Sequence, residues 1–311
     1  MTKPRRQLIS LEDTPYYHIV SRCVRRAFLC GSDGEKCYEH RRQWIVDRMR
    51  LLSSLYAVDI CSYAVMSNHY HIVLKLNPSE SETWDQDAVM QRWLTLYKGP
   101  VLVQRFLAGE ALCNAERDTV SDIITSWRKR LCDISWFMKC LNEPIARAAN
   151  KEDNCTGHFW ESRFKSQALL TEEALLSSMV YVDLNPIRAK VAETPETSDH
   201  TSIKERITPT FNLTDAIHDQ CFNNNLELPI KPLASFEDGA SDKEQLGILY
   251  SLSDYLQLVD WTGRIIREDK RGAIPGPLPP ILKRLDIPIE QWLLNSQQFE
   301  AVVHRRFRKI A

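Results

Sequence analysis

The stretch VMSNHYHIVLKL, residues 65–76, places two histidines inside the alternating pattern of a half-buried strand. Valine, isoleucine and leucine fill most of its second half, which is typical of a strand. Side chains at positions i and i+2 of a strand point to the same face of the sheet. His69 and His71 therefore project side by side, and Tyr70 faces the opposite way. The two imidazoles are either a coincidence on a polar face or two ligands of one metal ion.

The same stretch closes a predicted hairpin. The segment VDICSYAVMS (58–67) has the composition of a strand, and Ser67-Asn68 is a turn signal between it and the histidines. Strands joined so tightly pair antiparallel. Before them, TPYYHIVSRCV (14–24) is rich in aromatic and β-branched residues, and EKCYEHRRQWIVDRMRLLSSLY (35–56) has apolar residues at helical spacing. The first part of the chain is therefore predicted to run strand, helix, strand, strand.

A later strand and helix continue this pattern. HFWESRFKSQALL (158–170) is predicted to be a fourth strand, and TEEALLSSMVYVDLNP (171–186) a helix. Thr171 is a good N-cap for that helix, and Pro186 disfavours helical geometry at the residue before it. The sequence between the third and fourth strands is mostly helical, most clearly at residues 84–97 and 132–150. The whole order predicts an α+β fold with a mainly antiparallel sheet and helices on one face.

The character of the sequence changes beyond the last of these elements. The polar connector ETPETSDHTS (193–202) leads into a region of little pattern, and residues 245–311 look helical again apart from AIPGPLPP (273–280). We therefore expect one main domain with a helical insertion, followed by an accessory, mostly helical C-terminal region. Their expected bounds are 8–205 for the domain, about 78–131 for the insertion and 206–311 for the C-terminal region.

Length and composition exclude several classes of protein. The chain has 311 residues, of which 43% are hydrophobic and 26% charged, so a sizeable core can form and wholesale disorder is excluded. The net charge of −1 means that local clusters of cations must carry any argument for nucleic-acid binding. The N-terminus lacks the apolar segment that a signal peptide would have. The sequence also contains no run of about 18 apolar residues, the length needed to span a bilayer. We expect a cytoplasmic protein without a membrane partner.

The cysteines also indicate a cytoplasmic protein. There are nine, an odd number, and no two of them form a C-x-x-C pair. A zinc ribbon and a framework of disulfides are both poorly supported by this spacing. Reduced thiols in a cytoplasmic protein are the expected state.

The helix after the fourth strand carries a polar face with a tyrosine at its centre. Ser177, Tyr181 and Asn185 are spaced by four residues and therefore share one face of the helix. Ser178 also belongs to the polar side, and the predicted buried side consists of Leu175, Leu176, Met179, Val180, Val182 and Leu184. Taken alone, Tyr181 is a tyrosine at the edge of a core whose hydroxyl contacts water.

Together these stretches resemble the REP-associated tyrosine transposases, which are HUH single-strand DNA nucleases with one catalytic tyrosine. His69-x-His71 on a strand and Tyr181-x-x-x-Asn185 on a later helix carry the resemblance. The family is also resembled by the flanking sequences TPYYHIVSRCVRR, YAVMSNHYHIVLKL and GHFWESRFKSQALLTEEALLSSMVYVDLNPIRAKV. The similarity covers roughly residues 10–76 and 132–200.

The resemblance implies a fold, a site and a substrate. The fold would be an RRM-like or ferredoxin-like sheet, and His69, His71 and Asn185 would bind Mg²⁺ or Mn²⁺. Tyr181 would attack a phosphate of single-stranded DNA beside a palindromic hairpin, forming a 5′-phosphotyrosine and releasing a 3′-hydroxyl. Asn185 stands where the insertion-sequence branch of the family has glutamine, and it offers a carbonyl oxygen with a shorter reach. The tyrosine could serve its own chain or a partner's site, so a homodimer is an open alternative.

Several cations near these motifs are predicted to contact DNA phosphates. They follow the first strand, lie on the fourth strand or follow the tyrosine helix: Arg22, Arg25, Arg26, Arg163, Lys165 and Arg188. Further basic residues lie at the N-terminus and in HRRFRK (304–309). His18, on the first strand, is a candidate for stacking on a base.

Two other functions stay open at this point. A nucleic-acid-binding regulator could use the same fold without nuclease activity. A metal-dependent hydrolase would need a carboxylate base near the histidines, for which Asp59 and Asp183 are the candidates closest in sequence to the two motifs.

Overall fold

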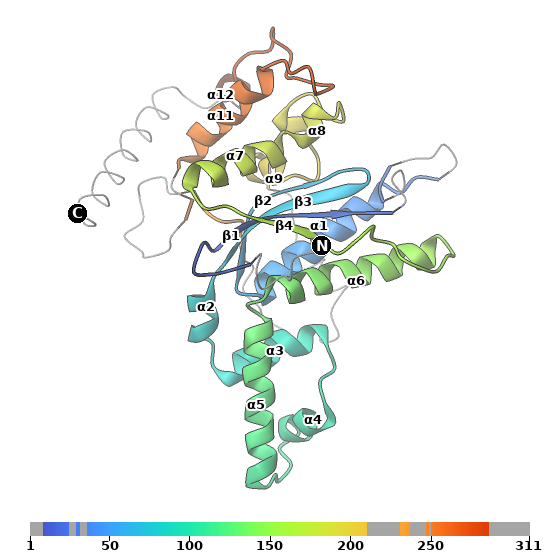
Figure 1. Ribbon diagram of the computed structural model, residues 1–311, viewed down its shortest axis with the longest axis vertical. Helices are drawn as coiled ribbons and strands as arrows, with labels where there is room; N and C mark the ends of the chain where they lie inside the picture. Colours follow the sequence, from blue (N-terminus) through green and yellow to red (C-terminus); the bar gives the residue numbers. More distant parts are fainter. Residues whose placement is uncertain are drawn as a thin grey trace, which may run out of the picture.

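A four-stranded antiparallel sheet lies at the centre of the computed structural model (Figure 1), which describes residues 9–24, 29–31, 36–209, 231–236, 247–248 and 250–285. Its strands are β1 (Tyr16–Arg22), β2 (Val58–Val65), β3 (His69–Leu76) and β4 (Lys165–Ala168). Their spatial order is β2-β3-β1-β4, with helices between β1 and β2 and between β3 and β4. This is the ferredoxin-like arrangement, so the expected α+β class with an antiparallel sheet is confirmed.

The predicted hairpin is present. Val65 pairs with Tyr70, and the backbone N–H of Met66 donates to the carbonyl of His69 over 2.8 Å. Ser67 and Asn68 form the turn. This short connection fixes the register, and with it the face of the sheet on which each residue of β3 lies, because a slip of one residue would exchange the two faces of the strand.

The two faces of β3 meet different helices. Tyr70, Ile72 and Leu74 point into a core shared with the antiparallel pair α1 (His40–Leu55) and α6 (Ile134–Glu152). His71 and Val73 point to the other face, which α7 (Glu172–Asp183) covers. Helices therefore cover both faces rather than the one face expected (Figure 1). The reason is that β2 and β3 also bear buried apolar side chains on the second face, and these need a cover.

The insertion forms a helical lobe that packs against the α1 and α6 layer. Its helices are α2 (Pro78–Thr83), α3 (Gln86–Leu96), α4 (Val101–Leu107) and α5 (Asn114–Arg130). Trp93 of α3 stacks on Trp127 of α5, with ring centroids 5.6 Å apart, and meets Trp136 of α6 edge-on. The core of the insertion is thereby continuous with the core under the sheet.

The fourth strand is shorter than the predicted segment 158–170. Only Lys165–Ala168 pairs with β1 as a strand, because a bend at residues 161–163 separates it from an isolated bridge between Trp160 and Cys23. The indole N–H of Trp160 donates to the carbonyl of Asn142 on α6 over 2.9 Å. The tyrosine helix is capped as expected, with the Thr171 hydroxyl accepting from the backbone N–H of Ala174.

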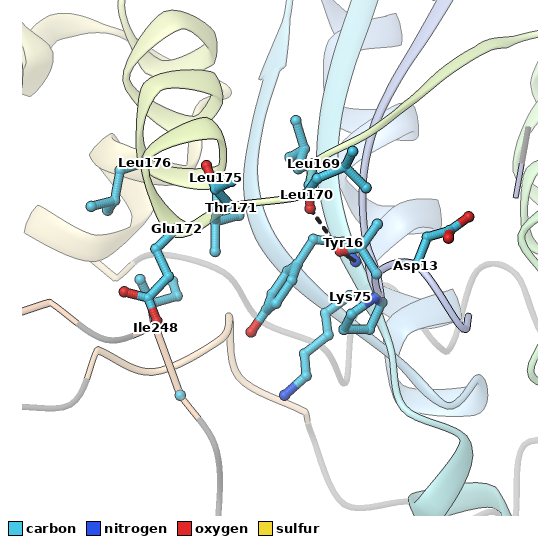
Figure 2. A pocket seen from close by; sticks show the side chains of 13 residues that line it. Asp13, Tyr16, Lys75, Leu169, Leu170, Thr171, Glu172, Leu175, Leu176 and Ile248 are labelled. Atoms are coloured by element: carbon cyan, nitrogen blue, oxygen red, sulfur yellow. Dashed lines mark hydrogen bonds between the residues drawn. The ribbon is translucent and has the colours of Figure 1, made fainter. Parts of the chain in front are cut away.

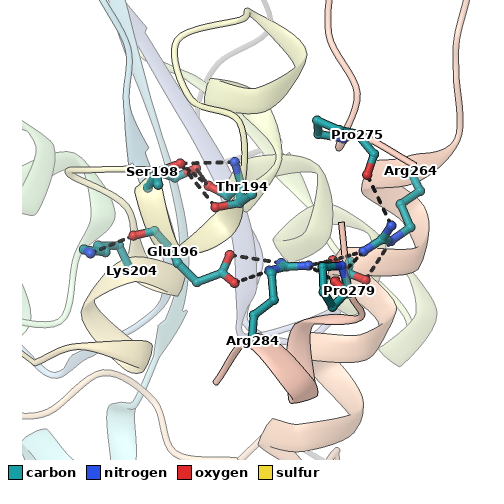
Figure 3. Close-up of polar contacts among 10 residues, drawn as sticks. Thr194, Glu196, Ser198, Lys204, Arg264, Pro275, Pro279 and Arg284 are labelled. Atoms are coloured by element: carbon teal, nitrogen blue, oxygen red, sulfur yellow. Dashed lines mark hydrogen bonds and ion pairs between the residues drawn. The ribbon is translucent and has the colours of Figure 1, made fainter. Parts of the chain in front are cut away.

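The described part of the C-terminal region packs on α7. Its elements and the segments that lead to it are α8 (Asn185–Arg188), the 3₁₀ turn η2 (Pro195–Thr197), α9 (Ser202–Ile207), α11 (Leu252–Arg264) and α12 (Ile281–Arg284). Figure 3 shows how Arg284 of α12 pairs with both oxygens of Glu196. The same guanidinium pairs with Asp260 of α11 over 3.0 Å. Within the described residues, no helix is both long and apolar enough to cross a membrane.

Candidate active site

Three histidines and a tyrosine meet on the α7 face of the sheet. His18 comes from β1, His69 and His71 come from β3, and Tyr181 comes from α7. The ring of Tyr181 stands edge-on to His71, with centroids 5.5 Å apart, and lies 6.1 Å from the ring of His18. His69 and His71 lie side by side with centroids 4.9 Å apart. Tyr181 is 44% exposed, so its ring borders the cluster while remaining open to solvent.

The strand register brings His18 to this cluster. In the β1–β3 ladder, Arg22 pairs with His69, Val20 with His71 and His18 with Val73. Paired residues of antiparallel strands share a face, so His18 lies diagonal to His71. Its Nε2 is 2.9 Å from Nδ1 of His71. The sequence suggested only base stacking for His18, because the register between the two strands cannot be read from either strand alone.

Burial keeps all three imidazoles neutral. It lowers the pKa of His71 to about 2, and the positive charges of protonated His69, protonated His18 and Arg22 would lower it in the same direction. Burial also lowers the pKa of His18 and of His69 to about 4. A histidine must be unprotonated at the ligating nitrogen to bind a metal. At neutral pH these side chains are in the form that a divalent metal requires.

One imidazole nitrogen of the cluster is buried without a partner. Nε2 of His71 makes no hydrogen bond with any described residue, although His71 is only 5% exposed. Nδ1 of the neighbouring His69 lies 2.5 Å from the side-chain oxygen of Asn68. An unsatisfied buried polar atom is unfavourable, and a metal ion would supply the missing partner. The two histidines therefore fit a divalent metal, and imidazole suits Mn²⁺ better than Mg²⁺.

Asn185 begins α8, one turn after Tyr181. It is half-buried, and its amide N–H donates to the carbonyl of Tyr181 over 3.1 Å. The side chain is thus turned back toward the last turn of α7. In the described part of the chain, three or more His, Cys, Asp or Glu side chains nowhere converge as a metal-binding group. His69, His71 and the side-chain oxygen of Asn185 are the candidate protein ligands.

Tyr70 lies on the opposite face, as its position in the strand predicted. It is 1% exposed, and its hydroxyl donates to the side-chain oxygen of Asn142 over 2.5 Å. The amide N–H of Asn142 in turn donates to the hydroxyl of Ser21. Burial raises the pKa of Tyr70 well above its usual value. The middle residue of the His-Tyr-His sequence is therefore a core residue and cannot reach the histidine cluster.

Two of the predicted DNA-contacting cations border the cluster. Arg22 is exposed, and its positive charge is close enough to lower the pKa of both His69 and His71. Lys165 is exposed and pairs with Val20, which places it on the same face. Arg163 is exposed just before β4. The remaining predictions fall elsewhere: Arg25, Arg26, the N-terminal basic residues and residues 304–309 lie outside the described residues.

Arg188 is used inside the fold rather than toward the cluster. Its guanidinium donates to the carbonyls of Thr262 and Ile265 over 2.7 Å each, and to that of Gly272 over 3.2 Å. The phosphate contact predicted for Arg188 is not the arrangement that the structure shows. These bonds fix the end of α11 and the following loop to α8.

Neither candidate carboxylate base faces the histidines. Asp183 is fully buried and accepts hydrogen bonds from the hydroxyls of Ser202 (2.6 Å) and Tyr255 (2.5 Å). Burial raises its pKa to about 6. Asp59 pairs with Lys231 over 2.7 Å. Both carboxylates instead bind side chains of other segments, Asp183 through hydrogen bonds and Asp59 through an ion pair.

A separate cavity lies at the other end of α7. Its volume is about 460 Å³, and it shares no lining residue with the histidine cluster. Figure 2 shows Tyr16 and Lys75 of the sheet facing the first turn of α7, including Glu172. The lining is largely apolar, and the ammonium group of Lys75 lies 5.7 Å from the centre of the Tyr16 ring.

Comparisons with known proteins add one likeness. No family model matches the chain, and no curated protein matches it. Among solved structures, the chain is similar to a REP-associated tyrosine transposase bound to a REP hairpin, with a TM-score of 0.39 and 10% sequence identity. The alignment covers 79% of this chain and 96% of that one. Similarity at this level carries no argument about the site or its chemistry.

Proposed function

We propose that this protein is a metal-dependent transposase that cleaves and rejoins single-stranded DNA through Tyr181. The observation that carries the proposal is the edge-on approach of Tyr181 to His71, whose buried Nε2 has no hydrogen-bond partner. An exposed nucleophile beside neutral metal ligands is the combination that phosphoryl transfer to a tyrosine requires. The substrate, single-stranded DNA beside a palindromic hairpin, is taken from the sequence resemblance.

His69, His71 and the side-chain oxygen of Asn185 would hold the metal, Mg²⁺ or Mn²⁺. When bound, the metal polarises a non-bridging phosphate oxygen and offsets the negative charge that repels a nucleophile. Because all three ligands are neutral, they leave the full charge of the ion available for the phosphate. The exposed cations Arg22 and Lys165 border the same face and would hold the flanking phosphates.

Tyr181 supplies the nucleophile. Its phenolic oxygen attacks the phosphorus, loses its proton to solvent, and forms a new P–O bond as the bond from phosphorus to the 3′ oxygen breaks. The 3′ oxygen takes up a proton and leaves as a hydroxyl, and the 5′ phosphate stays on the tyrosine. Rejoining reverses these steps, with the 3′-hydroxyl of another strand as the attacking group. A phenol with a reference pKa of about 10 is a usable leaving group for that reversal.

A covalent-adduct assay tests the proposal. The protein is incubated with Mn²⁺ and a labelled single-stranded DNA that contains a hairpin, and the products are separated under denaturing conditions. Wild type should yield a slowly migrating protein–DNA band, and Tyr181→Phe should yield none while still binding the hairpin. Chelation with EDTA should abolish the band, and so should His71→Ala. A Tyr181→Phe variant that still forms the adduct would refute the assignment.

The same assay separates two other functions. A nucleic-acid-binding regulator would bind the hairpin in EDTA and leave it uncut in Mn²⁺. A hydrolase with a water nucleophile would still cut the DNA after Tyr181→Phe. The buried bonds of Asp183 and the ion pair of Asp59 argue against the hydrolase, because neither carboxylate is available as its base.

A further inference from the structure

Each histidine of the proposed metal pair has a partner at the same ring nitrogen. Nδ1 of His71 lies 2.9 Å from Nε2 of His18, and Nδ1 of His69 lies 2.5 Å from Oδ1 of Asn68. His18 comes from β1, and Asn68 from the turn between β2 and β3. Metal-binding histidines commonly donate their second ring N–H to such an outer partner, which fixes the orientation of the ring.

The contact between His18 and His71 is a hydrogen bond and not a shared metal. The two ring planes differ by only 16°, and their centroids lie 5.1 Å apart. With 2.9 Å between the two nitrogens, the rings therefore meet nearly head-on. A metal on that line would need about 2.0 Å to each nitrogen, or about 4 Å in all. The gap holds one proton instead, so His18 is not a third ligand through this nitrogen.

The position of that proton follows from the other side of His71. If Nε2 of His71 carried a hydrogen, this buried donor would have no acceptor, because Nε2 has no hydrogen-bond partner. A proton on Nδ1 avoids this and is accepted by Nε2 of His18. For His69, the side-chain oxygen of Asn68 can only accept, so Nδ1 of His69 must be the donor. In both histidines Nε2 then carries the lone pair.

We propose that His18 and Asn68 are positioning residues that hold His71 and His69 as Nδ1–H tautomers, so that both Nε2 atoms are presented as metal ligands. The inference rests on the proposed metal site for its purpose, but the tautomers themselves are a property of the metal-free protein. His18 must itself be protonated on Nδ1 in order to accept at Nε2. Each of the three imidazoles, His18, His69 and His71, thus carries its proton on Nδ1. In His69 and His71 this proton lies away from the metal-binding nitrogen Nε2.

Long-range ¹H–¹⁵N NMR of the full-length, metal-free protein tests the tautomers directly, because the two nitrogens of a neutral imidazole differ in shift when one is protonated. We expect His69 and His71 to report Nδ1–H in the wild type. His18→Phe removes the acceptor while keeping a ring, and His71 should then lose its single tautomer. A His71 that carries its hydrogen on Nε2 in the wild type would overturn the inference.

Mn²⁺ binding, followed by the loss of the free-ion EPR signal, tests the purpose. Removing an outer partner of a metal-binding histidine typically weakens the metal about 10- to 100-fold. We expect that loss for His18→Phe and for Asn68→Leu. His18→Gln and Asn68→Asp each restore an acceptor oxygen and should recover most of the affinity, which a purely structural role would not predict. Unchanged affinity in His18→Phe would contradict the inference.

His40→Gln is the matched control. His40 lies on α1, on the other side of the sheet, where it pairs with Glu152 over 2.8 Å. This variant should keep both the tautomers and the affinity for Mn²⁺. If His69→Ala and His71→Ala both bind Mn²⁺ as the wild type does, the metal site of the proposed function is refuted. In that case the NMR result still decides the hydrogen-bond arrangement, so the two failures are distinguishable.

Discussion

The ring of Tyr181 and the imidazole of His71 stand edge to face, with centroids 5.5 Å apart. One residue belongs to a helix and the other to the middle of the sheet, and β4 lies between them in the chain. Their meeting depends on α7 covering the face of the sheet that bears the histidines. That placement puts Tyr181, and not Tyr70, beside the histidines.

The two tyrosines should respond differently to the loss of a hydroxyl. Tyr70→Phe leaves the buried amide of Asn142 without its donor, so we expect a loss of about 1–3 kcal/mol in the free energy of unfolding. The covalent DNA adduct should persist in this variant. Tyr181→Phe should show the reverse, with near-normal stability and no adduct. Denaturant unfolding and the adduct assay check both, and loss of the adduct in Tyr70→Phe with the fold intact would contradict the choice of nucleophile.

Metal binding should be insensitive to mild acid. Because burial lowers the pKa of His69 to about 4 and that of His71 to about 2, protons compete with a metal only well below pH 5. Mn²⁺ affinity should therefore change less than about threefold between pH 7.5 and 5.5. Two exposed histidines with a pKa of about 6.5 would lose about 100-fold over the same range. A titration of Mn²⁺ at each pH, with a steep loss centred near pH 6.5, would speak against the buried pair.

Asp183 should make stability depend on pH in the opposite sense to a carboxylate whose pKa is lowered by an ion pair. Burial raises its pKa to about 6, so between about pH 4 and 6 the folded chain holds a proton that the unfolded chain has released. Raising the pH through this range therefore lowers the free energy of unfolding, by up to about 1.4 kcal/mol per pH unit. Asp183→Asn removes this pH dependence. Its free energy of unfolding should therefore rise relative to that of the wild type as the pH rises. Urea unfolding at several pH values measures this difference.

A constant difference between Asp183→Asn and the wild type would contradict that assignment. The groups around Asp183 are the donors Ser202 and Tyr255 and the nearby cation Arg206. Tyr255→Phe is a useful companion, because it removes the donor from α11 and leaves the carboxylate in place. We expect it to lower stability by about 1–3 kcal/mol.

Two arginines should separate a role in the fold from a role in DNA binding. Arg188→Ala loses the bonds to the carbonyls of Thr262, Ile265 and Gly272 and should lower the free energy of unfolding by about 2–3 kcal/mol. Arg22→Ala, at an exposed position, should change stability by less than about 0.5 kcal/mol. It should instead reduce the slope of log K against log salt for hairpin binding by about 1.

The measurements are thermal or urea unfolding and hairpin affinity at several salt concentrations. Lys165→Ala is predicted to behave as Arg22→Ala does, because it lies exposed on the same face. An unchanged salt slope in both variants would remove these cations from the proposed DNA contact. A reduced slope in Arg188→Ala, with stability intact, would assign that residue to DNA after all.

Features that depend on residues close together in the sequence were predicted correctly. The hairpin, the shared face of His69 and His71 and the Thr171 cap depend on residues within a few positions of one another, and all three were predicted. The extent of β4 was wrong, because the strand pattern at 158–170 does not show the bend at residues 161–163 that interrupts the pairing with β1.

The sequence by itself determined the α+β class, the antiparallel sheet and the pairing of two histidines on one face, since periodicities of two and of about 3.6 residues are properties of the chain. Only the tertiary structure decided that helices cover both faces, that His18 joins His71, and that Arg188 is tied to α11. These features depend on the register between strands and on which apolar surfaces bury each other. Both are set by contacts between distant segments, whose free energy no local pattern contains.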